Sequence, residues 1–304
     1  MQGSDAHVLI AANPKSGASS GRMKVGQLRD ALQTSEFSVE ICESLELLQS
    51  RSHQLHAGGQ LRAVVSAGGD GTAAAVVNLI PVGVPVVVLP LGTENLLAKY
   101  LGLTSDVTLA LEALRGGKLH QLDVGKANGR LFLIMLGCGF DAEVVQHMHA
   151  ERRGHISRWT YSKPIWRAVR NYSYPLIDVE CEGVGGVEPV RFSTAWLFAF
   201  NLPQYAANLD FCPQACGTDG LLDICTFAQG GTLRGIGYLF HLWLRRHQQL
   251  KDFRHVTSGR FRLSSQGVVP YQLDGDPGGK LPLEVEVLPE RLTLLIPSHL
   301  KHGI

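Results

Sequence analysis

The strongest constraint on the fold is an alternation of short apolar runs with helix-compatible stretches over the first 120 residues. Four apolar runs are predicted to be buried strands, at His7–Ala12, Val39–Cys42, Ala63–Ala67 and Val84–Leu89. Helical patterns lie between or after them, at Arg22–Gln33, Thr72–Leu79, Asn95–Leu101 and Val107–Leu114. This alternation predicts a mainly parallel sheet with helices on both faces, whose ligands bind at the carboxyl ends of the strands.

Three loops after these strands carry polar or glycine-rich sequence: Asn13-Pro-Lys-Ser-Gly17, Gly68-Gly-Asp-Gly-Thr72 and Gly92-Thr-Glu-Asn95. Glycine lets backbone N–H groups converge on a phosphate, and the N-terminus of a following helix favours negative charge. Asp70 is unusual there because a carboxylate repels phosphate. It needs hydroxyl or N–H donors, or a cation, which favours nucleotide chemistry over simple anion capture.

The segment Gly68–Thr72, taken alone, is also compatible with an ordinary turn, which selects the same residue types. Its spacing fits the dinucleotide-binding fingerprint loosely, but the acidic candidate Glu94 lies beyond the Gly92-Thr93 turn rather than at the end of a strand. No Gly-Lys-Ser/Thr triplet is present, which excludes a P-loop.

After Gly116-Gly117 the pattern changes to strands joined by Gly/Pro turns. The predicted strands are Leu119–Val124, Arg130–Leu136, Leu176–Cys181, Phe192–Phe200, Leu222–Phe227, Arg260–Leu263 and Leu283–Val287. Helical inserts are predicted at Ala142–His149, Ser157–Asn171 and Thr232–His247. The sequence therefore predicts an α/β domain over 1–121 and a mainly antiparallel β domain over 122–291. Residues 292–304, with a strand at Leu292–Pro297, are expected to pack back on the first domain.

Composition, net charge and the lengths of the apolar runs indicate which partners and which cellular location to expect. The chain of 304 residues is 45% apolar and 18% charged with a net charge of +1, so no nucleic acid partner is indicated. The longest apolar runs, Val84–Leu91 and Leu131–Leu136, are far shorter than the roughly 18 residues of a membrane span. The N-terminal residues lack the pattern of a signal peptide. A cytoplasmic location is predicted.

Two stretches combine basic and aromatic residues. Residues 151–170 carry six Lys or Arg residues with Trp159, Tyr161 and Trp166, and a second basic run from Arg234 to Arg254 includes Phe240 and Trp243. Such stretches suit a transient contact with an anionic membrane surface at the inner face. They equally suit a solvated helix face with core aromatics.

The six cysteines contain no Cys-x-x-Cys pair and lie mostly in apolar runs, which favours reduced core thiols. Cys212 and Cys216 are spaced like half of a zinc site. No second Cys or His pair follows at a suitable spacing, so zinc is not expected there.

The three N-terminal loops in this order resemble the diacylglycerol kinase catalytic domain family, which includes bacterial lipid kinases and sphingosine kinases. The resemblance extends over nearly the whole chain. In the second half, the matching segments are Gly137-Cys-Gly-Phe-Asp-Ala142, Pro213–Asp223 with Asp219-Gly-Leu-Leu-Asp223, and Asp274-Gly-Asp276, where the family has its catalytic Asp-Gly-Glu.

The resemblance implies a role for each matched position. ATP would be bound by Asn13, Lys15, Ser16, Arg22, Gly68, Gly69, Asp70, Gly71, Thr72, Thr93 and Asn95. Lys15 and Arg22 would neutralise phosphates, and Asp70 is a candidate ligand of a catalytic Mg²⁺. Asp219, with the backbone near Cys216 and Leu221, would form a structural Mg²⁺ site. A hairpin turn is the alternative for Asp219-Gly220.

Asp274 is the candidate general base, assisted by Asp276. In phosphoryl transfer the attacking alcohol loses its proton late, so a positioned carboxylate suffices. Its place in the second domain implies catalysis in a cleft between the domains. Without the resemblance, the segment would be interpreted as a turn.

Two departures from the family pattern bear on these assignments. Asn95-Leu-Leu-Ala-Lys99 stands where the family usually has Asn-Asp-Phe-Ala-Arg, so Leu96 replaces an acid. Asp276 replaces a glutamate that is one methylene longer.

The function implied is an ATP- and Mg²⁺-dependent lipid kinase acting on a hydroxyl of a diacylglycerol-like or sphingoid lipid, in lipid metabolism and phospholipid biosynthesis. The lipid alcohol is the expected partner, and a homodimer is a further expectation. Two alternatives stay open. One is an NAD kinase, which shares Gly-Gly-Asp-Gly-Thr but usually adds an Asn-Glu pair that has no convincing counterpart here. The other is a non-catalytic nucleotide- or lipid-binding homologue.

Overall fold

The computed structural model describes residues 6–12, 19–35, 37–150, 172–183, 188–205 and 209–300. The chain divides into a first unit, residues 1–124 with 289–304, and a second unit, residues 125–288. The sequence pattern had placed these boundaries at 121/122 and 291/292. Two strands run from one unit into the other, β5 (Lys118–Ala127) and β16 (Leu283–Ile296).

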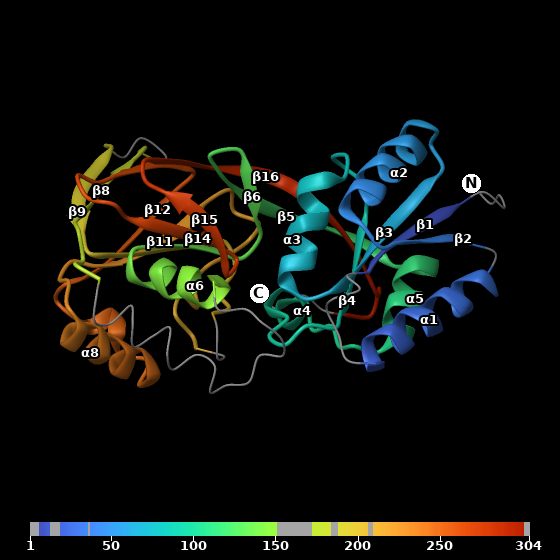
Figure 1. The fold of residues 1–304 in the computed structure, drawn as a ribbon, viewed down its shortest axis with the longest axis horizontal. Helices are drawn as coiled ribbons and strands as arrows, with labels where there is room; N and C mark the ends of the chain where they lie inside the picture. Colours follow the sequence, from blue (N-terminus) through green and yellow to red (C-terminus); the bar gives the residue numbers. More distant parts are fainter. Residues whose placement is uncertain are drawn as a thin grey trace. The chain divides into compact units, whose positions relative to one another are not determined.

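The first unit contains a parallel sheet (Figure 1). Its strands lie in the order β2 (Ser38–Cys42), β1 (His7–Ala12), β3 (Leu61–Gly68), β4 (Val86–Pro90) and the last part of β16. β1 pairs in parallel with β2 and β3, and β3 pairs in parallel with β4. β16 joins beside β4, with Leu294 opposite Val86. The strands are apolar at nearly every position because helices cover both faces.

The described residues of this unit form five helices: α1 (Ser19–Gln33), α2 (Leu45–Ala57), α3 (Asp70–Leu79), α4 (Leu96–Tyr100) and α5 (Val107–Gly116). Figure 1 shows α2 and α3 on one face of the sheet and α1 and α5 on the other. Side chains such as Ile10, Leu28, Val65, Leu89 and Leu114 fill the core between α1, α5 and the strands. The sequence prediction of an α/β fold with a mainly parallel sheet is confirmed.

Helix α2 was not predicted from the sequence. It starts after Ser44, whose Oγ accepts a hydrogen bond of 3.1 Å from the N–H of Leu47, and this is the usual cap of a helix N-terminus. Only Leu48, Ser52 and Leu55 are buried along it. Because so few positions of α2 are buried, its sequence shows only a weak helical periodicity of apolar residues.

The second unit is a sandwich of two sheets. One is antiparallel, in the order β12 (Phe253–Ser258), β11 (Leu222–Phe227), β10 (Trp196–Phe200), β7 (Met135–Cys138), β14 (Pro270–Leu273) and β15 (Asp276–Lys280). The other contains the first part of β16, then β13 (Arg260–Ser264), β8 (Ile177–Cys181) and β9 (Val190–Thr194), while β6 (Arg130–Phe132) pairs with the end of β5. Buried side chains of both sheets form one core. The predicted antiparallel β-rich second half is confirmed.

Two strands predicted as continuous are each divided between the two sheets, and both predictions were wrong in this respect. The predicted strand Arg130–Leu136 is β6 followed by β7, and Phe192–Phe200 lies across β9 and β10. At the second switch, Thr194 Oγ1 donates to the carbonyl of Phe227 at 2.8 Å. The sequence does not reveal such a change of sheet, because only one or two residues separate the paired strands and neither link contains glycine or proline.

Helices α6 (Phe140–Ala150) and α8 (Thr232–Trp243) flank this unit. The predicted helix Thr232–His247 ends early because Arg245 adopts a left-handed conformation with φ of 55°. The predicted helix Ser157–Asn171 and the basic stretch 151–170 lie outside the described residues. Within the described part of the chain, no helix is long and apolar enough to cross a membrane.

Candidate functional site

The loops after β3 and β4 contact each other through glycine backbone. A Cβ atom added to Gly92 would lie 2.5 Å from Cα of Gly69, closer than real Cβ atoms approach backbone. A Cβ on Gly68 would lie 2.2 Å from Oγ1 of Thr72. The N–H of Leu91 also donates to the carbonyl of Gly68 at 2.9 Å. Glycine is therefore required here by the fit of the two loops, independently of any ligand.

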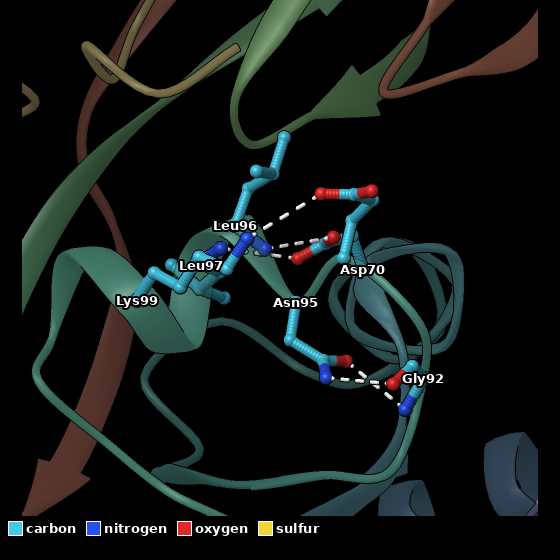
Figure 2. Close-up of polar contacts among 7 residues, drawn as sticks. Asp70, Gly92, Asn95, Leu96, Leu97 and Lys99 are labelled. Carbon is cyan, nitrogen blue, oxygen red and sulfur yellow. Dashed lines mark hydrogen bonds and ion pairs between the residues drawn. The ribbon is translucent and has the colours of Figure 1, made fainter. Parts of the chain in front are cut away.

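Asp70 links the first of these loops to helix α4. Its Oδ2 accepts a hydrogen bond from the N–H of Leu96 at 2.9 Å, and its Oδ1 accepts one from the N–H of Leu97 at 3.0 Å (Figure 2). N–H groups at a helix start lack partners within the helix, and the helix dipole favours a negative charge there. Among the partners that the sequence allowed for Asp70, the structure supplies N–H donors. A Mg²⁺ role for Asp70 stays a prediction.

Asn95 fixes the second loop. Its Oδ1 accepts from the N–H of Gly92 at 3.0 Å, and its Nδ2 donates to the carbonyl of Gly92 at 2.8 Å (Figure 2). Asn95 itself is left-handed, with φ of 50° and ψ of 52°, a conformation that asparagine tolerates better than most residues. Asp70 and Asn95 together hold the start of α4 and the loop before it.

A cavity of about 430 Å³ opens beside this loop in the first unit. It is lined by Ser20, Gly21, Lys24, Pro90, Leu91, Gly92, Thr93, Glu94, Asn95, Ala98, Lys99, Leu103, Thr104 and Ser105. Two lysines supply positive charge. Lys24 Nζ donates to the carbonyl of Ser105 at 2.8 Å and also contacts its hydroxyl, and Lys99 Nζ lies 3.4 Å from Oε2 of Glu94. Its volume lies within the usual range of small-ligand sites.

The structure brings only part of the predicted ATP-binding set to this cavity. Thr93 and Asn95 line it, whereas the Gly68–Thr72 loop is joined to it through the contact of Gly69 with Gly92. Arg22 is exposed and is not among the lining residues. Asn13, Lys15 and Ser16 lie outside the described residues. Sequence reasoning missed Lys24, whose only signal is its place one turn after Gly21 on α1.

Asp274 lies in the second unit, in the turn between β14 and β15. Its carboxylate accepts three backbone hydrogen bonds, from the N–H groups of Leu133 (2.7 Å), Ile134 (2.8 Å) and Met135 (3.0 Å). These residues form the link at which the chain leaves β6 and enters β7 in the other sheet. Asn201 also stabilises this link, because its Nδ2 donates a hydrogen bond of 2.8 Å to the carbonyl of Leu133. The Asp274 carboxylate thus supplies the acceptor for three consecutive N–H groups at this link between the sheets.

Asp276 has different partners from Asp274. Its Oδ1 lies 3.0 Å from Nε2 of His149 on α6, and its Oδ2 lies 3.8 Å from a guanidinium nitrogen of Arg130. Its side chain is one-third exposed. The two acids of the Asp-Gly-Asp segment are therefore held by two separate sets of groups.

A buried polar chain supports the same turn. Gln272 accepts the N–H of Gly275 at 2.7 Å and donates to Oδ2 of Asp141 at 2.9 Å, while the hydroxyl of Tyr205 donates to Oδ1 of Asp141 at 2.8 Å. Burial raises the pKa of the Asp141 carboxyl above its usual value, against the two hydrogen bonds. The sequence marked Asp141 only as part of a motif and assigned it no role.

The Asp219 segment has the geometry of a turn. Oδ1 of Asp219 accepts the N–H of Leu221 at 3.0 Å, and Gly220 has φ of 76°. Cys216 contacts the hydroxyl of Thr218 through its sulfur at 3.3 Å. This is a local turn just before β11 rather than the tight turn of a hairpin, and a Mg²⁺ site there stays a prediction.

Two family models match the chain. Residues 7–127 match the diacylglycerol kinase catalytic domain, and residues 135–296 match the YegS C-terminal NAD kinase beta sandwich-like domain. The chain belongs to the diacylglycerol kinase catalytic domain family. It is therefore an enzyme of a kinase family, and its fold combines the two domains that the family models describe.

Curated relatives of this family member are distant. An uncharacterized protein of Synechocystis sp., sll0036, is 23% identical over 77% of the chain, and the match spans only 54% of that protein's length. A protein of Staphylococcus carnosus named diacylglycerol kinase is 25% identical over 79% of this chain and 78% of its own. A protein of the same name from Mycobacterium tuberculosis is 27% identical over 78% of this chain and 77% of its own length.

Solved structures show the same fold. A diacylglycerol kinase from Bacillus anthracis superimposes with a TM-score of 0.66 and 15% identity, covering 96% of this chain and 97% of that one. Yeast NADH kinase, solved with NADH, superimposes with a TM-score of 0.54 and 12% identity, covering 95% and 82%. At these identities the likeness concerns the fold alone.

Proposed function

We propose that this protein is an ATP- and Mg²⁺-dependent lipid kinase that transfers the γ-phosphate of ATP to a hydroxyl of a diacylglycerol-like or sphingoid lipid. The observation that carries the proposal is the cavity beside β4, where Lys24 and Lys99 meet the Gly92–Asn95 backbone. Cations and backbone N–H groups at a strand's carboxyl end are the chemistry that binds phosphate. The names of the Staphylococcus carnosus and Mycobacterium tuberculosis relatives suggest the acceptor class.

In this proposal, the predicted ATP-binding residues and the two cavity lysines together bind the phosphates of ATP. Lys24 and Lys99 neutralise phosphate charge with Lys15 and Arg22. Mg²⁺ would be taken by oxygen ligands such as Asp70 or Asp219. The enzyme works in the cytoplasm, peripherally at the inner membrane face.

Asp274 is proposed as the general base and Asp276 as its neighbour in the same turn. Three backbone donors fix the Asp274 carboxylate, which favours a positioned acceptor of the alcohol proton. The same contacts mean that substitution at Asp274 also disturbs the fold. Loss of activity alone does not identify a base.

The decisive experiment incubates the protein with ATP labelled at the γ-phosphate, Mg²⁺ and separate acceptors: diacylglycerol, sphingosine and NAD. We expect a labelled lipid phosphate. Labelled NADP without labelled lipid would establish the NAD kinase alternative. Calorimetric binding of MgATP without transfer to any acceptor would establish the non-catalytic homologue.

Two matched pairs of variants sharpen the assignment. Lys24→Met removes a cavity charge and should weaken MgATP binding, while Lys126→Met removes a lysine paired with Glu286 in the second unit and should not. Asp274→Asn should abolish transfer and retain MgATP binding. Asn201→Ala loosens the same Leu133 link without removing an acid. If both variants lose transfer in proportion to their lost stability, Asp274 is not a base.

We further propose that α8 docks on an anionic lipid surface. Its outward stripe is apolar, with Leu233 86%, Ile236 60%, Phe240 56% and Trp243 68% exposed, at helical spacings of three and four residues. The opposite side is already satisfied, since Tyr238 is buried and stacks on Phe227 at 4.2 Å between ring centroids. A monomeric protein rarely exposes so many large apolar side chains together.

The basic residues near α8 favour an anionic lipid surface over an uncharged partner. The exposed basic residues Arg234, Arg246 and Lys251 lie within α8 or shortly after it in the chain. Arg245 is also exposed but pairs with Asp210 at 2.7 Å, and Arg254 lies over the ring of Phe192. An amphipathic helix with a basic surround inserts its apolar face among lipid headgroups and gains about 1 kcal/mol per basic residue near an anionic surface.

The test compares sedimentation of the protein with vesicles of phosphatidylcholine, with and without phosphatidylglycerol. We expect binding to the anionic vesicles, at least tenfold weaker for the double variant Leu233→Asp with Trp243→Asp. Val82→Asp, which changes an exposed apolar residue of the first unit, is the control and should bind as the wild type does. Equal binding of all three proteins would refute the proposal, and so would concentration-dependent dimerisation of the wild type that the double variant loses.

A further inference from the structure

A cluster of two cysteines and a histidine lies in the second unit and shares no residue with the groups described above. The ligand atoms of Cys212, Cys225 and His255 all lie within 4.8 Å of one another. Both cysteines are fully buried, and the histidine side chain is 30% exposed. The cluster is thus a buried thiol pair that solvent reaches at the imidazole.

The sheet register explains why these residues meet. On the antiparallel pair β11 and β12, Cys225 stands directly opposite His255, so their side chains lie on one face of the sheet. Asp223 lies two residues before Cys225 and shares that face because strand side chains alternate. Cys212 comes from the segment before β11 and contacts both Cys225 and His255. Sequence spacing did not reveal the set, since its members lie on three segments.

Asp223 orients the imidazole. Its Oδ1 lies 2.7 Å from Nε2 of His255, and the carboxylate is almost fully buried. A carboxylate that holds one histidine nitrogen is the usual companion of a metal-bound histidine, because it sets the ring orientation for the other nitrogen.

From this arrangement we infer a site for a thiophilic divalent ion of the Zn²⁺ type, bound by the sulfurs of Cys212 and Cys225 and by a nitrogen of His255. Two thiolates and an imidazole are preferred zinc ligands. With Zn–S bonds near 2.3 Å, the ligand atoms of a tetrahedral site lie roughly 3.5–4 Å apart, so shifts of about 1 Å close the site. On binding, the protons of the two thiols pass to the buffer as two sulfur–metal bonds form.

The ion would tie the two ends of the Pro213–Leu221 segment together. Cys212 precedes that segment, while Asp223 and Cys225 follow it on β11. The proposed Asp219 turn lies inside the loop that the ion would close. The zinc site is independent of the kinase proposal, because it rests on a separate set of residues.

The test uses the full chain, reduced, equilibrated with Zn²⁺ and then freed of unbound metal. Elemental analysis should find one zinc per chain in the wild type and in Cys42→Ser, a buried cysteine of the first unit. Cys212→Ser, Cys225→Ser and His255→Gln should lose stoichiometric zinc. Asp223→Asn should weaken affinity about 10–100-fold.

A second measurement needs no variant. The Co²⁺-loaded wild type should show the absorption of thiolate-to-cobalt charge transfer. Absence of that absorption, zinc retained equally by Cys212→Ser, or a Cys212–Cys225 disulfide in place of metal binding would each overturn the inference. Because the kinase assay on zinc-free protein reports separately, failure here leaves the proposed function standing.

Discussion

Asp70 in the first unit and Asp274 in the second do the same physical task in two different settings. Each carboxylate accepts backbone N–H groups of a segment distant in sequence, 26 and 27 residues away for Asp70 and 139 to 141 residues away for Asp274. Asp70 binds the start of a helix, where water or another cap is an alternative partner. Asp274 binds a link between two sheets. The comparison teaches that both motif acids are structural anchors, whatever chemistry they also perform.

The largest expected effect is at Asp274. Asp274→Ala leaves the N–H groups of Leu133, Ile134 and Met135 without their acceptor, and each unsatisfied buried group costs about 1–3 kcal/mol. We expect a loss of about 3–5 kcal/mol in the free energy of unfolding, measured by urea denaturation. A loss below that of Asp70→Ala would reverse the comparison.

Gly92→Ala tests the glycine contact of the first unit. The added Cβ would meet Cα of Gly69 at 2.5 Å, so backbone must move. Overpacking of this kind costs about 1–3 kcal/mol, and MgATP binding should weaken because the cavity loop is displaced. Gly26→Ala is the control, since its Cβ meets no atom within 4 Å and lies in α1. The control should be neutral or slightly stabilising.

Asp70→Ala should cost about 1–2 kcal/mol, the usual range for a lost helix cap. Because the N–H groups of Leu96 and Leu97 are at a partly exposed helix start, water offsets part of the loss. Thermal unfolding of Asp70→Ala and Asp274→Ala side by side checks the order. A Mg²⁺-dependent difference in stability between wild type and Asp70→Ala would show that Asp70 also serves a cation.

Asp141→Asn should have the smallest effect, seen as a change in pH dependence. Burial raises the pKa of Asp141 in the folded state above the ordinary 3.8, so the unfolded chain loses this proton first as pH rises. The carboxyl therefore lowers stability increasingly above about pH 4, until the pH passes the folded-state pKa. Relative to the wild type, Asp141→Asn should gain stability across that window in urea titrations. A constant difference between the two proteins would contradict this.

The first unit was more predictable than the second for a physical reason. Its strands, such as His7–Ala12, are buried on both faces and stand apart between helices, so composition alone marks them. In the second unit, only one or two residues without glycine or proline separate β6 from β7 and β9 from β10, so no turn sequence marks the change of sheet. The partners that permit the change, Asp274 and Asn201 for the first of them, lie far away in sequence.

The candidate site was predictable where a motif fixes backbone. Thr93 and Asn95, which the resemblance assigned to ATP binding, line the cavity, because glycine and asparagine mark the unusual conformation of that loop. Their binding of ATP stays a prediction. Lys24 was not predictable, since a lysine on a helix surface carries no local signal. The cross-strand set of Cys212, Cys225 and His255 was hidden for the same reason as the sheet switch: pairing register decides it.

The hydrogen bonds of Asp274 also bear on the order of folding. Leu133, Ile134 and Met135 emerge from the ribosome some 140 residues before their acceptor. Closing so long a loop delays native contacts and slows folding. The hydrogen bonds that hold the link between β6 and β7 therefore cannot form until nearly the whole chain has been synthesised. β16, which pairs with β4 at Leu294 and Val86, is synthesised later still. Neither the parallel sheet of the first unit nor the sandwich of the second can therefore be completed until most of the chain has been made.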